Sequence, residues 1–220
     1  MSIRTTDNLF VGGDIQYTGS LKPDLQRSSL AQESLALYPI PFEAWRVWDA
    51  FQTNLPGTAA SDDLGVISGT FGSGSPSIQT SDQKNNGSAT SQYARAIVSM
   101  PAEYDDAADV VLRFHCGALT TVASVSMVID CEVHEMDLDA TSSSDIVSTA
   151  SQSCNNLVLS DKDFVVDASS LVRGDLLDVR VTLTIQDSGT GTVVKGIIGA
   201  AYLTCDIRGG RADVQGCGGS

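Results

Sequence analysis

A chain of 220 residues, 42% of them hydrophobic, is long enough for one sizeable domain, and no shift in composition marks a second. Its 27 acidic residues against 13 Lys and Arg give a formal net charge of −14. This charge excludes nucleic acid as a partner and disfavours anionic membranes, because both would repel it. The sequence also predicts no membrane-spanning helix and no secretory signal.

The first 38 residues have no sustained hydrophobic periodicity, and we interpret residues 1–38 as an N-terminal arm. Within it, VGGDIQYTGSL is typical of a strand–turn–strand, and Ser29 followed by Gln32 fits the capping box of a single helical turn. Residues 39–209 are predicted to form the domain. The Gly-rich residues 210–220 are predicted to be a tail that holds no structure by itself.

Within the predicted domain, apolar residues recur at every second position. Side chains of a strand alternate between its faces, so each such segment has one core face and one wet face. Further strands are expected near 45–51, 66–71 and 164–166, and 197–207 is apolar on both faces at its start. The clearest inward sets are Ala94, Ala96, Val98 and Met100; Val110, Leu112, Phe114 and Cys116; the odd positions of 123–133; and the odd positions of 177–185.

Turn residues separate these segments at 85–87, 173–175 and 187–191, and the last turn is expected to close a hairpin. About eight strands, each with one buried face and one face in contact with solvent, and no long helix predict an all-β fold. We expect an antiparallel two-sheet β-sandwich of jelly-roll type, with an immunoglobulin-type sandwich as the alternative.

Motifs for catalysis are missing from the sequence. It contains no G-x-S-x-G elbow and no G-x-x-x-x-G-K, and no basic residue follows the glycines of GTFGSGSPS, which favours a structural loop over phosphate binding. Glycoside hydrolysis would need facing carboxylates in an aromatic-lined cleft, and aromatic residues make up only 6% of the chain. We predict no enzyme and no catalytic residue.

Two groups of side chains are candidate metal ligands. His115 and Cys116, like Cys131 and His134, point to opposite faces of a strand, which disfavours zinc. The acidic clusters at 61–63, 135–139 and 161–163 lack the spaced D-x-D-x-D-G pattern, so a solvated acidic rim is favoured over calcium. We therefore predict no metal site and no cofactor.

The remaining chemistry-bearing residues have ordinary structural interpretations. Five cysteines without C-x-x-C spacing (Cys116, Cys131, Cys154, Cys205 and Cys217) are typical of thiols buried in a protein made in a reducing cytoplasm. A redox or disulfide role for Cys217 stays open. Trp45 and Trp48 are interpreted as core packing, in preference to an interface or sugar platform.

Three stretches of the domain resemble a group of tailed-bacteriophage virion proteins, the small β-sandwich decoration (cement) proteins of the capsid exterior. The arm segment GDIQYTGSLKPDLQRSSLAQESLALYPIP resembles the arm that precedes the domain in that group, so the resemblance covers roughly residues 10–209. The three stretches are YPIPFEAWRVWDAFQTNLPGTAASDDLGVISGTFGSGSPSIQTSD, LTTVASVSMVIDCEV and SDKDFVVDASSLVRGDLLDVRVTLTIQDSGTGTVVKGIIGAAYL.

The resemblance implies a structural protein that binds the major capsid protein on the outside of the phage head and stabilises contacts between capsid subunits. It also implies assembly with itself, for which a trimer is preferred and a dimer comes second. The chain would be made in the host cytoplasm and reside in the virion. The alternative is a carbohydrate- or receptor-binding module of a head fibre or spike. A jelly-roll hydrolase, which would need clustered carboxylates in a cleft, comes third.

Overall fold

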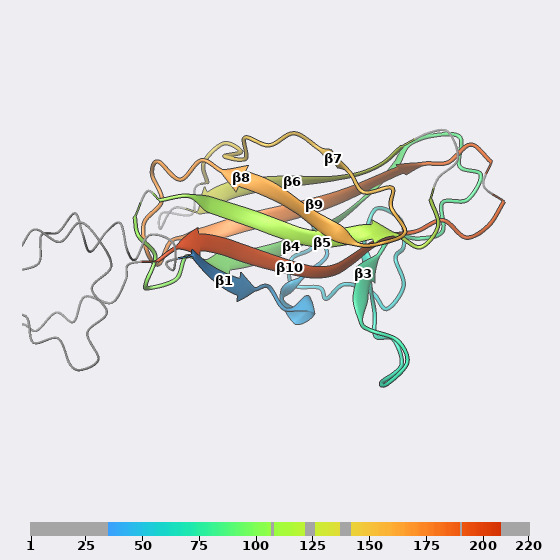
Figure 1. The fold of residues 1–220 in the computed structure, drawn as a ribbon, viewed down its shortest axis with the longest axis horizontal. Helices are drawn as coiled ribbons and strands as arrows, with labels where there is room; N and C mark the ends of the chain where they lie inside the picture. The colour runs from blue at the N-terminus through green and yellow to red at the C-terminus, as the bar shows by residue number, and fades with distance from the viewer. Residues whose placement is uncertain (1–34, 107, 122–125, 137–141, 190, 208–220) are drawn as a thin grey trace, which may run out of the picture. The chain divides into compact units, whose positions relative to one another are not determined.

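The computed structural model describes residues 35–106, 108–121, 126–136, 142–189 and 191–207 (Figure 1). Over these ranges the chain forms strands joined by turns and one short 3-10 helix, η1 (Phe42–Ala44). No helix of the described part has the length and apolarity needed to cross a membrane. The strands are β1 (Leu35–Pro39), β2 (Gly65–Ile67), β3 (Ser77–Gln79), β4 (Thr90–Ser99), β5 (Val110–Ala118), β6 (Ser126–Met136), β7 (Gln152–Ser153), β8 (Ser160–Val166), β9 (Leu176–Gln186) and β10 (Gly196–Asp206).

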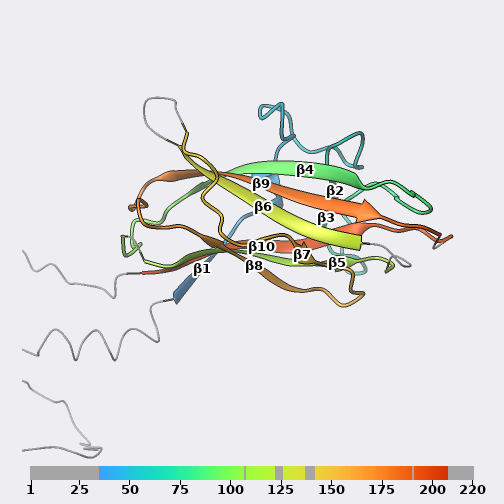
Figure 2. The same cartoon turned by 90° about the horizontal axis from the view of Figure 1, so that it is seen from above.

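Two antiparallel sheets lie face to face, and the two layers are seen separately in Figure 2. Sheet A has the order β2-β3-β10-β5-β8, with β1 also paired to β10, and sheet B has the order β4-β9-β6-β7. The second half of the strands pairs back on the first in reverse order, as β3 with β10, β4 with β9, β5 with β8, and β6 with β7. This nested pairing is that of a jelly roll, so the predicted fold class is confirmed.

The core lies between the sheets and follows the predicted alternation. In β9 every odd residue from Leu177 to Ile185 is buried, and the even residues between them are only partly covered. Phe114 of β5 lies at the centre, with its ring 6.1 Å from that of Trp45 and 5.9 Å from that of Phe164. The period-2 pattern therefore identified the core faces of the long strands correctly.

Three local expectations are wrong. The strand expected near 66–71 is β2, which ends at Ile67, and Phe71 lies in a turn. Residues 45–51 form no strand: Arg46 alone bridges to the edge of β4, and the chain then turns away. The turn at 187–191 does not close a hairpin, because β9 belongs to sheet B and β10 to sheet A, so this segment crosses between the layers. Turn residues indicate where a chain reverses, but not which sheet the next strand joins.

The domain also begins earlier than residue 39. Residues 35–38, which the sequence analysis gives to the arm, form most of β1 and pair with β10 over the register Leu35 to Asp206 and Pro39 to Tyr202. The sequence LALYP is apolar at every position, so it carries no period-2 signal. The rest of the predicted arm and the predicted tail lie outside the described residues.

Candidate functional site

The residues weighed as zinc ligands do not come together. His115 faces outward from sheet A, with Nδ1 2.8 Å from Asp161 Oδ1, while His134 on sheet B contacts the Ser143 carbonyl at 2.9 Å. Cys116 and Cys131 are buried in the core. Among the residues that the structure describes, no group of three or more His, Cys, Asp or Glu could hold a metal ion.

Most described carboxylates of the acidic clusters have basic or polar partners, whereas Asp63 Oδ1 is buried without a hydrogen-bond partner among the described residues, and this burial raises the pKa of Asp63. Arg113 donates to both oxygens of Asp163 at 2.7 Å, which lowers the pKa of that carboxyl, and it lies 3.6 Å from Asp161. Asp62 accepts a hydrogen bond from Trp48 Nε1 at 3.0 Å, which holds the pKa of Asp62 below its usual value. Residues 137–139 of the third cluster lie outside the described residues. The two described clusters thus serve cross-strand and loop contacts.

The two tryptophans have different environments. Trp45 is 1% exposed and belongs to the core, as the sequence analysis predicts. Trp48 lies on the outer face of sheet B, half-buried, with its ring 5.1 Å from that of Tyr93. The Arg180 guanidinium lies 5.4 Å from the Trp48 ring and 5.3 Å from the Tyr93 ring, and donates to Glu132 at 2.5 Å. We call Trp48, Tyr93 and Arg180 the aromatic–arginine cluster.

Beside this cluster, a row of three side chains of different chemical type crosses sheet B. The register pairs Tyr93 with Thr182 and Thr182 with Asp130, so a ring, a hydroxyl and a carboxylate lie side by side on three strands. All three side chains are partly exposed, and partial burial raises the pKa of Asp130. An aromatic ring beside hydroxyl and carboxylate groups is a chemical surface that can take a sugar ring.

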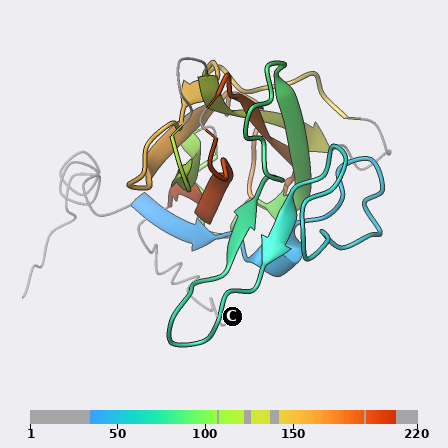
Figure 3. The same ribbon diagram turned by 90° about the vertical axis from the view of Figure 1, so that its right-hand side faces the viewer.

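The loop between β2 and β3 projects from the sandwich (Figures 1 and 3). Its middle is a hydrogen-bonded turn in which Thr70 O accepts from Ser73 N at 2.9 Å and from Gly74 N at 2.8 Å. Phe71 lies in this turn and is fully exposed. A solvated phenylalanine on a narrow loop is unusual, because aromatic side chains bury a large area and gain most when a partner covers them.

Backbone packing fixes the base of this loop. Gly69 has a φ of 66°, and a Cβ placed on it would lie 2.3 Å from the carbonyl oxygen of Gly74. Only glycine fits such an approach, so the two arms of the loop lie against each other without side chains between them. The loop therefore presents Phe71 on a compact support.

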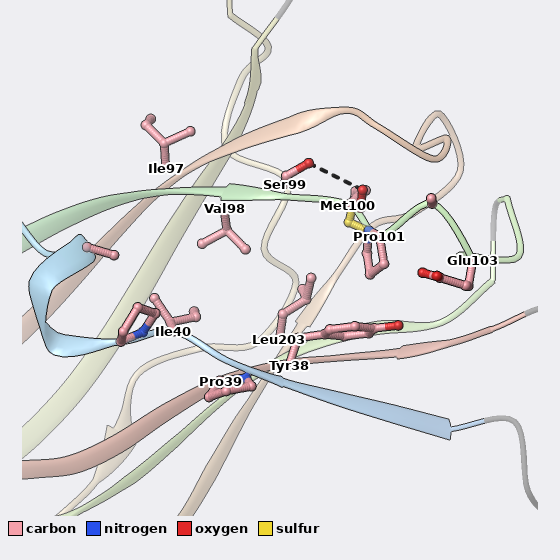
Figure 4. A pocket seen from close by; sticks show the side chains of 13 residues that line it. Tyr38, Pro39, Ile40, Ile97, Val98, Ser99, Met100, Pro101, Glu103 and Leu203 are labelled. Atoms are coloured by element: carbon pink, nitrogen blue, oxygen red, sulfur yellow. Dashed lines mark hydrogen bonds between the residues drawn. The ribbon is translucent and has the colours of Figure 1, made fainter.

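A third surface feature is a groove of about 480 Å³ at the open edge between the sheets (Figure 4). One wall is the segment Tyr38–Pro41 of sheet A and the other is the end of β4 with the turn that follows it. Leu203 of β10 lies between them. Burial in the groove and the nearby Glu103 carboxylate raise the pKa of the Tyr38 hydroxyl. We call this feature the open-edge groove.

Val98 shows that the core is open at this groove. By alternation it belongs to the inward face of β4, whose other inward members Ala94, Ala96 and Met100 are 0–1% exposed. Val98 is nevertheless only partly buried, because none of the described strands covers the gap between β1 and the end of β4. An inward apolar side chain left in contact with water marks a place where added apolar groups would be stabilised.

The backbone of β4 is also unpaired beside the groove. Arg95 and Arg46 exchange both backbone hydrogen bonds, at 2.8 and 3.1 Å, so the N–H and C=O of Arg95 point away from β9. In an antiparallel ladder this direction repeats every second residue, so those of Ile97 and Ser99 point the same way. In the described part of the chain no backbone group pairs with them.

Comparison with known proteins finds only distant structural similarities. No family model matches the chain, and no curated protein matches it. Among solved structures it is similar to the CBM22-1 xylan-binding domain of Xyn10C from Paenibacillus barcinonensis, with 13% identity, a TM-score of 0.40, and coverage of 79% of this chain and 95% of that one.

A family 16 carbohydrate-binding module shares 10% identity at a TM-score of 0.37, covering 68% of this chain and 89% of that chain. The Stig cyclase Fisc of Fischerella sp. TAU shares 9% identity at a TM-score of 0.38, with 79% and 100% covered. Likeness at this level carries no argument about what this chain is or what it binds.

Neither the exposed position of Phe71, which was expected at the end of a strand, nor the open-edge groove was predicted from the sequence. The flanking glycines of Gly69-Thr70-Phe71-Gly72 were a usable signal, since an aromatic residue between turn residues cannot reach a core face. The groove left no signal, because it results from the lack of a strand between two segments that are far apart in the sequence.

Proposed function

We propose that this protein is a non-enzymatic decoration protein of a tailed-phage capsid, located on the outside of the head. Its partner is the major capsid protein, and it acts in several copies, with a trimer first and a dimer second. The resemblance over roughly residues 10–209 gives this class, and the fully exposed Phe71 on its projecting loop is the structural observation that supports it. Interface energy often concentrates in a few aromatic anchors.

The charge of the chain fits a role among many identical copies. A net charge of −14 keeps neighbouring copies soluble and prevents them from stacking on one another. An attachment site on such a molecule needs an apolar side chain whose neighbours in the sequence are uncharged. The turn 70–74 has this character, since its residues Thr, Phe, Gly, Ser and Gly are all uncharged.

Replacing Phe71 with Ser is expected to weaken binding to phage heads by about 30-fold, the effect of losing one anchor residue. Cosedimentation of the purified chain with heads stripped of it measures this. Phe71→Tyr should retain binding, and Val172→Ser, which removes another exposed apolar side chain, should not change it. Equal binding of the Phe71→Ser and unaltered chains would contradict the proposal, provided that their thermal unfolding is the same.

Carbohydrate binding is a second candidate, favoured by the row of Tyr93, Thr182 and Asp130 beside Trp48. The row offers an aromatic ring and two groups that bond to hydroxyls. Against it, the Arg180 guanidinium already lies over both rings. The two rings of this cluster are therefore already in contact with a side chain of the same molecule, so carbohydrate binding comes second.

A glycan array separates the two candidates. If the row binds sugars, a positive glycan should quench the fluorescence of Trp48, and Asp130→Asn should lower the affinity by about tenfold, the effect of one charge-assisted hydrogen bond. Thr184→Val, on the neighbouring row, is the matched control. An array without any positive glycan would eliminate this candidate and leave the capsid role unaffected.

A further inference from the structure

The open-edge groove is built to accept one more strand. It combines an inward side chain left uncovered, Val98, with free backbone groups at Ile97 and Ser99 on the same edge. An extended segment laid along that edge would bond to those groups and direct alternate side chains onto Val98 and Leu203. An unpaired strand edge beside exposed apolar side chains promotes aggregation in a protein that works in many copies, unless another segment covers it.

The chain itself contains a segment of suitable chemistry. Residues 1–34 precede β1, and within them Asp14-Ile15-Gln16-Tyr17-Thr18-Gly19 alternates between apolar and polar residues and is rich in strand-forming types. Ile15 and Tyr17 would share one face of a strand, with Gln16 on the other. Residues 20–34 separate this segment from β1 and can span about 50 Å when extended. The segment can therefore reach a neighbouring molecule.

Charge favours the arm over the rest of a second copy as the occupant. Residues 1–34 contain three basic and four acidic side chains, whereas the whole chain has 13 basic and 27 acidic ones. Two domains brought together would repel each other, and Glu103 at the groove adds to that repulsion. A nearly neutral arm avoids this cost.

The proposed assembly in several copies favours a neighbour's arm over the chain's own. Residues 20–34 are long enough for the segment at 14–19 to reach the domain of another copy. The choice between the two arms rests on the proposed function, and the crosslinking experiment below distinguishes them.

We propose that the open-edge groove binds residues 14–19 from the arm of a second copy as an added strand beside β4, with Tyr17 and Ile15 over Val98. Copies of the chain are thereby linked by exchanged arms. The inference rests on the proposed assembly in several copies and deepens it, because it names the contact that links them, and this contact can be tested in solution without any phage head.

Sedimentation equilibrium of the full chain over a concentration series tests the link. The unaltered chain should self-associate, and Tyr17→Asp should raise the dissociation constant at least about tenfold, while Gln16→Asp, which adds the same charge to the other face, changes it less than about twofold. On the groove side, Ile97→Pro removes an N–H that no described residue uses, and should act like Tyr17→Asp. Ile97→Thr keeps that N–H and is its control.

A photo-crosslinker at position 17 identifies the chain that receives the arm. Crosslinks between two chains that map to β4 or to 38–41 support the inference. Crosslinks within one chain, a monomeric full chain, or self-association that Tyr17→Asp and Ile97→Pro leave unchanged would each overturn it. Head binding is measured separately with Phe71→Ser, so failure of one proposal does not imply failure of the other.

Discussion

Truncating Phe114 to Ala is expected to destabilise the domain by about 3–5 kcal/mol, a large part of the total stability of a domain of this size. Phe114 is 0% exposed and joins Trp45 to Phe164 at the centre of the sandwich. Its loss removes the contacts between β5, β8 and the 45–55 segment together. Urea unfolding followed by circular dichroism measures the change, because Trp45 fluorescence would itself be altered by the missing ring.

His115→Ala, at the next residue of the same strand, is the matched control. It removes an exposed contact to Asp161 and should cost less than about 1 kcal/mol. If Phe114→Ala cost no more than this control, the arrangement of the core would be different from the one described.

Replacing Gln92 with Leu is expected to cost about 2–4 kcal/mol although it makes an inward position more apolar. Gln92 is 1% exposed, and its Oε1 accepts from Ser81 N at 2.7 Å. Its Nε2 donates to the carbonyls of Ser61, at 2.9 Å, and Asp63, at 3.2 Å. Leucine would remove the partner of Ser81 N and of the Ser61 carbonyl beside the core, whereas the Asp63 carbonyl would keep its bond from Ala60 N at 3.2 Å.

The same unfolding experiment checks this prediction. Gln186→Leu removes one hydrogen bond from an exposed glutamine to the Gly87 carbonyl and should change stability by less than about 0.5 kcal/mol. A Gln92→Leu domain as stable as the unaltered one would mean that the loops at 61–63 and 81 do not depend on this side chain.

Long strands were predictable, and Gln92 shows where prediction ends. In β9 each inward residue makes the same kind of contact, so alternation alone identifies the buried face. Gln92 occupies an inward position of β4 for a different reason, since it satisfies backbone groups of two distant loops. A pattern of apolar residues cannot reveal a partner that is brought near only by the fold.

The short elements and the candidate surfaces were less predictable. β7 has two residues and β3 has three, so neither carries enough positions for a period. Trp48 and Trp45 differ by three positions and look alike in the sequence, yet one lies on the outside of sheet B and the other in the core. The irregular path of 45–51 separates them, and no alternation rule covers irregular backbone.

The nested order of the strands has a consequence for the timing of folding. Of the described strands, β10 is the last in the sequence, yet it lies in the middle of sheet A, with β1, β3 and β5 all paired to it. Until β10 has been synthesised, β1 and β3 have no neighbour from this central position, and most native pairings span a large part of the sequence. Sheet A can therefore complete its pairing only after translation has passed residue 206.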